Sequence, residues 1–158
     1  MHTRTGQTGA DDGDGIGRVL VRLYEVISFA DGGEPDWAGM SEVFSPHARI
    51  TRIVPEGIDY FDLPTFQAMA RELIVVGAYT GFHEREVSRR VDRVGEVAHV
   101  LSAYETRREP GARECLGRGI NSIQLIRESG EWRVLSLCWD DEGLRGRDVR
   151  ALVGGRAS

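Results

Sequence analysis

Residues 117–139 read GRGINSIQLIRESGEWRVLSLCW. Apolar and polar side chains alternate along both halves of this stretch, as they do in β-strands that bury one face. Ser129 and Gly130 separate the two halves and suit a two-residue hairpin turn. The pattern therefore predicts two long antiparallel strands, from about Glu114 to Arg127 and from Glu131 to Asp141.

The sequence before this stretch extends the alternation toward the N-terminus. Phe82 to Val94 and Val97 to Arg107 also alternate with a period of two, and Gly95 and Glu96 lie between them. Four consecutive strands joined by turns are typical of an antiparallel sheet.

Helical periodicity is confined to the first half of the chain. Apolar residues recur at spacings of three and four from Ile16 to Ala30, from Asp36 to Phe44 and from Asp62 to Gly77. Residues Ala48 to Val54 form a strand pattern between the second and third helices. Helices followed by hairpins favour an α+β fold, in which three N-terminal helices pack on the concave face of a curved, mainly antiparallel sheet.

Length and composition fit one domain. The chain has 158 residues, of which 41% are hydrophobic, and its mostly interleaved charges sum to -5. Such a surface does not fit a nucleic-acid backbone, so no nucleic-acid partner is expected. No apolar stretch reaches the roughly 18 residues that span a bilayer, so we expect no membrane partner and a cytoplasmic location. We expect the domain to cover residues 16–142, between a flexible tail (1–15) and an irregular tail (143–158).

Simple alternation from the hairpin turn assigns each strand residue to one face of the sheet. The inward face is then expected to carry Val87, Arg89, Tyr104, Asn121, Cys138 and Asp140, with Asn121 opposite Cys138. Gly117 and Gly119 share this face and leave space where side chains would stand. A pocket is therefore predicted between the helices and the sheet.

The opposite face is expected to differ between the first two and the last two strands. On the first two it is polar, with Glu84, Glu86 and Arg90 among its residues. On the last two it is apolar, with Ile120, Leu135, Leu137 and Trp139. A bare apolar sheet surface commonly marks a subunit contact, so we expect a homodimer formed through this face.

Two stretches of the sequence resemble a known superfamily. Gly117 to Leu125, followed by Trp132-Arg133-Val134 and Trp139-Asp140, resembles the last hairpin of the nuclear transport factor 2-like superfamily, and more closely that of its SnoaL-like branch. The run Phe44-Ser45-Pro46-His47-Ala48 resembles the entry into the first strand of that family. The resemblance covers Ile16 to Glu142 and implies a cone-shaped α+β barrel with a central pocket and a sheet-mediated dimer.

The expected pocket contains candidates for binding and for acid–base chemistry. Asp140 is a candidate general base, and His83 is the one histidine expected on the inward face. Arg89 suits an anionic group, while Tyr104 and Asn121 can donate hydrogen bonds. The candidate ligand-binding residues are Trp37, Val87, Arg89, Tyr104, Asn121 and Cys138.

No metal and no cofactor are expected. His83-Glu84-Arg85-Glu86 lies on a predicted strand, so it is not the helical H-E-x-x-H motif of zinc proteases. The sequence also lacks a P-loop, a G-x-G-x-x-G turn between strand and helix, and a G-x-S-x-G elbow.

Three functions stay open at this stage, because a shared fold does not fix a function. The first is the binding of a small, largely hydrophobic molecule in the central pocket. The second is a cofactor-free isomerase, cyclase or dehydratase that uses an acid or base in the pocket. The third is a structural dimerisation module whose cone is filled by its own side chains.

Overall fold

The computed structural model describes residues 15–140. Its helices are α1 (Ile16–Ile27), α2 (Trp37–Val43) and α3 (Leu63–Val75). Its strands are β1 (Phe44–Val54), β2 (Gly57–Phe61), β3 (His83–Val94), β4 (Val97–Arg107), β5 (Gly117–Glu128) and β6 (Glu131–Asp140). The two expected tails lie outside the described residues, apart from Gly15.

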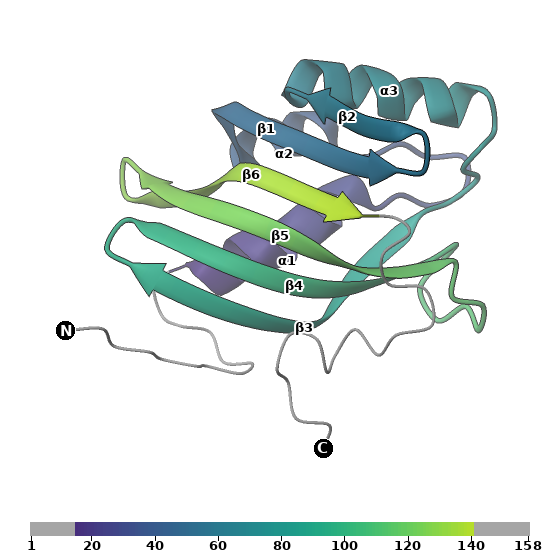
Figure 1. Cartoon of the computed structure of the whole chain (residues 1–158). Coiled ribbons are helices and arrows are strands. Elements are labelled where there is room, and N and C mark those ends of the chain that lie inside the picture. The colour runs from purple at the N-terminus through teal and green to yellow at the C-terminus, as the bar shows by residue number, and fades with distance from the viewer. Residues whose placement is uncertain (1–14, 141–158) are drawn as a thin grey trace.

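The strands form one six-stranded sheet in the order β2-β1-β6-β5-β4-β3 (Figure 1). Neighbouring strands are antiparallel except β1 and β6, which run parallel. The helix α1 crosses one face of this sheet, and α3 lies beside β1 and β2 (Figure 1). The expected α+β fold with helices on a mainly antiparallel sheet is therefore confirmed.

Periodicity in the sequence does not predict β2, which forms a hairpin with β1. Val54 pairs with Gly57, so Pro55 and Glu56 make the turn between the two strands. Two of the apolar residues of β2, Ile58 and Tyr60, are exposed, so the strand carries little burial signal. The strand is held mainly by pairing at the edge of the sheet, and Phe61 at its end packs against the core.

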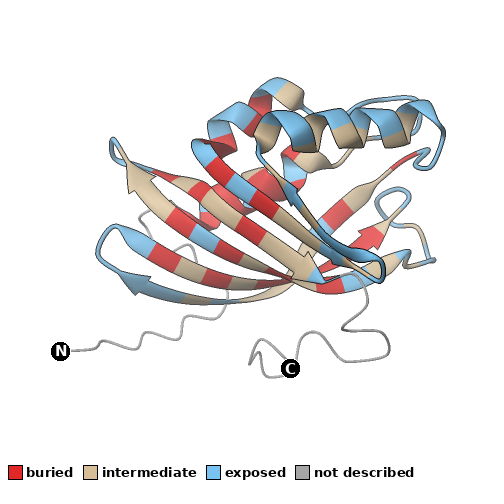
Figure 2. Ribbon diagram, turned by 45° about the horizontal axis from the view of Figure 1, so that its top comes forward, coloured by how far each residue is buried: buried red, intermediate tan, exposed pale blue. Residues whose placement is uncertain are grey.

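The hydrophobic core fills one end of the space between α1 and the sheet. Ile16 and Leu20 on the first turns of α1 are buried, as are Val100, Ile123 and Val134 on the facing strands. Buried residues form stripes across the central strands in Figure 2. This end of the domain is closed by side-chain packing, which places any open space at the other end.

The register of β6 shifts in the middle of the strand. Gln124 of β5 pairs with Ser136, but the next residue, Leu125, pairs with Val134. Leu135 is therefore an extra residue in β6, which defines a β-bulge. A one-residue shift turns every later side chain to the other face of the sheet.

This bulge corrects the expected placement of four residues. Leu137 and Trp139 line the space between sheet and helices, so their expected position on the outer face is wrong. Cys138 and Asp140 alternate with them and lie on the outer side instead. Cys138 pairs with Ser122 rather than with Asn121.

A second bulge lies in β3. Glu86 pairs with Tyr104, whereas Ser88 pairs with Ala103, so Val87 is the extra residue. Val87 packs against Ala103 on the outer face, which corrects its expected inward position.

The same bulge reverses the expected orientation of two acidic residues. Before it, Glu84 and Glu86 point inward, although simple alternation places them outside. After it, Arg89 pairs with Ser102 and Val91 with Val100, which keeps Arg89 on its expected inward face. The inserted residue thus brings two carboxylates to the concave face without disturbing the far half of the strand.

Two alanine substitutions test the bulge in β6. Leu137→Ala is expected to lower the free energy of unfolding by about 2–3 kcal/mol, because Leu137 is 6% exposed and packs in the core. Leu135→Ala is expected to cost less than half as much, because Leu135 is only half-buried. Urea unfolding of both variants measures the difference. Equal losses would contradict the bulge, since unbroken alternation gives both residues the same face.

Candidate functional site

A cavity of about 370 Å³ lies between α1, α3 and one end of the sheet. Its wall is mostly apolar and comes from the C-terminal half of α1, the inner face of α3 and the concave side of the strands. Apolar residues of the wall include Leu23, Ile27, Phe29, Met40, Phe44, Ile50, Leu137 and Trp139. The cavity occupies the end of the cone that the core leaves unfilled.

Helix α3 forms one wall of this cavity. It begins with a capping box, in which the Asp62 carboxylate accepts the backbone N–H of Thr65 at 2.9 Å and the Thr65 hydroxyl oxygen accepts the N–H of Asp62 at 3.0 Å. Phe66, Leu73 and Ile74 on its inner face line the cavity. No residue of α3 is buried, in contrast to α1 and α2 (Figure 2). The helix therefore covers a space rather than a packed core.

Polar side chains gather at one part of the cavity wall. Glu84 on β3, Tyr104 and Thr106 on β4, and Asn121 on β5 all line the cavity, and each is at most 8% exposed. The backbone N–H of Glu84 donates to the Ser28 hydroxyl at 3.1 Å, which ties the start of β3 to the end of α1. This polar cluster is the part of the site that can orient a bound molecule.

A chain of hydrogen bonds runs from the cluster into the protein. The Asn121 amide donates to the Glu84 carboxylate (Nδ2 to Oε1, 3.4 Å) and to the Tyr24 hydroxyl (3.2 Å). Tyr24 and Ser102 hydroxyls lie 2.6 Å apart, and the Ser102 hydroxyl donates to Glu86. Because Ser102 uses its proton toward Glu86, Tyr24 donates to Ser102.

Glu86 is the last acceptor of this chain. Its Oε2 accepts from Ser102, and its Oε1 lies 2.6 Å from Nε of Arg89. Every hydroxyl and amide proton in the chain points toward one of two carboxylates. The network thus fixes the Asn121 amide so that its nitrogen faces Glu84.

Burial is the largest cause of the pKa shifts of Tyr24 and Glu86. The pKa of Tyr24 is raised far above its ordinary value, first by burial and then by the negative charge of Glu84, so the phenol stays neutral. Burial also raises the pKa of Glu86, although the hydrogen bond from Ser102 and the Arg89 guanidinium act in the opposite direction.

The two glycines of β5 have different surroundings. Gly117 lines the cavity, and a Cβ placed there would meet no atom within 4 Å. Gly119 pairs with Tyr104, whose hydroxyl would collide with a Cβ at that position. Asn121 is the partner of Ser102 across the strands. Open space expected beside both glycines is therefore present only at Gly117.

Two of the six candidate ligand-binding residues, Tyr104 and Asn121, line the cavity. Arg89 faces inward but pairs with Glu86 and is not part of the wall. Val87 and Cys138 lie on the outer side of the sheet.

Trp37 begins α2 and packs against the core, with the Arg71 guanidinium 4.5 Å from the centre of its ring. It does not line the cavity either. Ligand binding by any of the six stays a prediction.

Neither candidate acid–base residue lines the cavity. Asp140 is exposed at the end of β6, where it pairs with Ile53 of β1. His83 pairs with Arg107 and alternates with the inward-facing Glu84. The carboxylate that the structure brings into the wall is Glu84, which sequence reasoning missed because no residue pattern reveals the bulge in β3.

Among residues 15–140, no three histidine, cysteine, aspartate or glutamate side chains converge as they would around a metal ion. Within the same range, no helix is long and apolar enough to cross a membrane.

The geometry defines an α+β domain with a lined cavity between sheet and helices, and solved structures share this architecture. A protein of unknown function with a cystatin-like fold from Nostoc punctiforme matches with a TM-score of 0.65 and 12% identity, over 85% of this chain and 94% of that chain. A Kribbella flavida protein matches with a TM-score of 0.63 and 16% identity, over 83% and 90%.

A third similar structure is described as NTF2-like. It is an NTF2-like protein with a cystatin-like fold from Novosphingobium aromaticivorans, with a TM-score of 0.58 and 16% identity, over 88% of this chain and 86% of that chain. No family model and no curated protein matches the sequence. The chain therefore has the cystatin-like fold of NTF2-like proteins, and the resemblance seen in its last hairpin is confirmed at the level of the fold.

The buried carboxylate gives a prediction about pH. The raised pKa of Glu86 means that the folded state holds this proton more tightly than the unfolded chain. The resulting stabilisation is complete below the ordinary value of 4.5 and is lost as the pH rises through the native pKa. Wild type should therefore lose stability relative to Glu86→Gln as the pH rises through this window, as measured by urea unfolding.

Glu96→Gln is the matched control, because its stability difference from the wild type is expected to change with pH in the opposite direction. A hydrogen bond from Arg127 lowers the pKa of Glu96, so wild type should lose stability relative to this variant as the pH falls. A stability difference between wild type and Glu86→Gln that does not change with pH would contradict the raised pKa of Glu86.

Proposed function

We propose that the domain binds a small, largely hydrophobic molecule in the cavity beneath α3. The observation that carries this proposal is the wall itself: about 370 Å³ of space is bounded mostly by apolar side chains, with a few polar groups gathered in one place. Pockets for small organic ligands commonly run from ~300 to 1,000 Å³ and have this composition. The half-buried apolar face of α3 would gain burial from an occupant.

The polar cluster supports a specific orientation of the ligand. Glu84, Tyr104 and Asn121 would bind the one polar group of the molecule, while its apolar body would lie against α3. Polar groups in the wall favour a ligand that carries a polar group over a purely hydrocarbon one. A purely structural module with a filled cone is the weaker candidate, because the wall encloses open space beside Gly117.

Acid–base catalysis is a weaker candidate in the form that the sequence suggests. Asp140 and His83 both lie away from the cavity wall, so neither can reach a molecule inside it without rearrangement. A binding function needs only the groups that line the cavity.

Filling the cavity tests the proposal. Gly117→Leu should place its side chain in the open space at Gly117 and weaken the binding of a neutral hydrophobic fluorescent probe by about tenfold or more. Gln124→Leu is the matched control, because Gln124 is exposed on the outer face of the same strand. Probe titrations of the folded variants give the two affinities. Equal weakening by both substitutions, or saturable binding that neither affects, would place the probe outside the cavity and contradict the proposal.

We also propose that a second copy of the chain covers the outer face of the sheet. Ala103 is buried there beneath Val87, Leu101 and Ile120, so an apolar patch remains although Leu137 and Trp139 have turned inward. Light scattering of the wild type should give twice the 17.5 kDa of one chain. Ile120→Asp should shift the mass to that of one chain, and Val21→Asp, on the exposed side of α1, should not. A single-chain mass for the wild type would contradict the dimer.

A further inference from the structure

Asn121 is the one asparagine of the chain, and it lines the cavity from β5 with only 5% of its surface exposed. Both protons of its amide nitrogen are directed into the protein. One is donated to the Tyr24 hydroxyl at 3.2 Å, and the other is donated to the Glu84 carboxylate at 3.4 Å. The amide nitrogen therefore has no proton left for a molecule in the cavity.

The hydrogen bonds behind Asn121 determine which way round its amide lies. The Ser102 hydroxyl donates to Glu86, so the Tyr24 hydroxyl donates to Ser102 at 2.6 Å. Because this uses the one proton of Tyr24, its oxygen can only accept from Asn121, which requires the amide nitrogen on that side. The carbonyl oxygen of Asn121 consequently points away from Tyr24.

This carbonyl oxygen has no hydrogen-bond partner among residues 15–140. It is not sealed inside the protein either. In the same range, the only fully enclosed side-chain nitrogen or oxygen atoms without a partner are the indole nitrogens of Trp37 and Trp132. The oxygen therefore keeps open surface, and the open space that Asn121 lines is the cavity. An acceptor in such a place costs free energy until a donor meets it.

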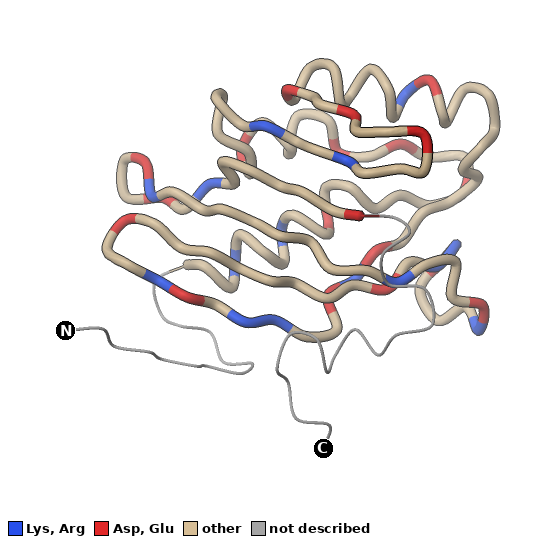
Figure 3. Tube along the Cα trace, in the orientation of Figure 1, with Lys and Arg blue, Asp and Glu red and all other residues tan. Residues whose placement is uncertain are grey.

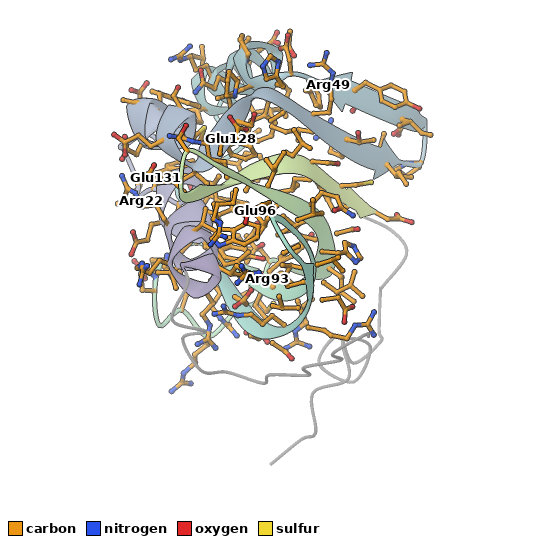
Figure 4. The ribbon with its side chains drawn as sticks, turned by 90° about the vertical axis from the view of Figure 1, so that its left-hand side faces the viewer. Arg22, Arg49, Arg93, Glu96, Glu128 and Glu131 are labelled. Atoms are coloured by element: carbon orange, nitrogen blue, oxygen red, sulfur yellow. The ribbon has the colours of Figure 1, made fainter. Side chains whose placement is uncertain are left out.

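The strand that carries this acceptor is neutral on both sides of it. Figure 3 shows β5 without a charged residue between Arg118 and Arg127. Figure 4 labels Glu96 at the turn between β3 and β4, and Glu128 and Glu131 at the turn between β5 and β6, which lie at the closed end of the domain. The middle of β5 thus presents an uncharged amide oxygen, which accepts a proton from a neutral hydroxyl or N–H group.

We infer that the cavity selects hydrophobic molecules whose polar group is a hydrogen-bond donor, above all alcohols, with the hydroxyl proton donated to the carbonyl oxygen of Asn121. This inference rests on the proposed binding function and adds the chemical class of the ligand. An ether of the same shape offers only an acceptor, so it leaves the Asn121 oxygen unsatisfied. The apolar body of the alcohol lies against α3.

Two isomers test the inference. Octanol and heptyl methyl ether contain the same atoms in chains of nearly equal length, but only the alcohol carries a proton that it can donate. A hydroxyl is costlier than an ether oxygen to remove from water, so a cavity without an open acceptor would bind the ether more tightly. Calorimetric titration of the full chain should instead give octanol an affinity about fivefold to tenfold above that of the ether.

The variant Asn121→Leu locates the preference. Leucine has a similar shape and no polar atom, so octanol should lose its advantage, and the ether should bind at least as tightly as it binds the wild type. Gln124→Leu is the matched control, because it also exchanges an amide for an aliphatic side chain, but on the exposed outer face of β5. It should leave both affinities unchanged.

A spectroscopic measurement on the wild type gives an answer even where Asn121→Leu does not fold. Because the chain has a single asparagine, asparagine with an isotope-labelled side-chain nitrogen gives one amide signal in the nuclear magnetic resonance spectrum. A hydroxyl that donates to the carbonyl oxygen polarises the whole amide group. Saturation with octanol should therefore shift the Asn121 signal, and saturation with the ether should shift it much less.

The outcomes separate this inference from the function on which it rests. If both isomers bind and the ether binds as tightly as octanol or more tightly, the donor preference is overturned and the hydrophobic binding function stands. An octanol advantage that survives Asn121→Leu, or saturable octanol binding that leaves the Asn121 signal unmoved, would place the hydroxyl elsewhere and overturn the inference. If neither isomer binds, the inference falls, and the proposed function falls with it only when the neutral fluorescent probe also fails to bind.

Discussion

A residue inserted into a β-strand exchanges the two faces of everything that follows it, and β3 and β6 each contain such an insertion. Leu135 in β6 turns Leu137 and Trp139 toward the helices, and Val87 in β3 separates two inward-facing carboxylates from the outward-facing Ser88. Both bulges lie near the middle of their strands. Each lets the closed half of the sheet keep its packed core while the open half presents a different set of side chains to the cavity.

The buried hydrogen-bond chain joins α1 to the half of the sheet that carries the cavity. Tyr24 on α1 reaches Ser102 on β4 and Asn121 on β5, and through them both Glu84 and Glu86 on β3. Buried polar groups are costly unless all of them are satisfied, so such a chain tolerates few alternative arrangements. The position of the cavity wall is thus set by polar contacts as much as by apolar packing.

Much of the architecture follows from periodicity in the sequence, because a period of 3.6 or of 2 reflects which face is buried. The helices, the hairpin turns and the inward direction of Arg89 could be predicted in this way. The wall of the cavity could be predicted only in part. Tyr104 and Asn121 lie on strands β4 and β5, which contain no bulge, and their inward direction was accessible. Glu84 and Leu137 lie in strands with an inserted residue, and neither Val87 nor Leu135 has a side chain that marks it as one.

The lack of any buried residue in α3 bears on how a molecule reaches the cavity. The free energy needed to separate one element from the rest of a protein depends on the apolar surface that the element buries. Because α3 buries little, it can swing away from β1 and β2 at far lower cost than the unfolding of α1, whose Leu20 and Leu23 are fully enclosed. Entry and exit of the proposed ligand would therefore require only a local opening, and the packed end of the cone would stay intact throughout.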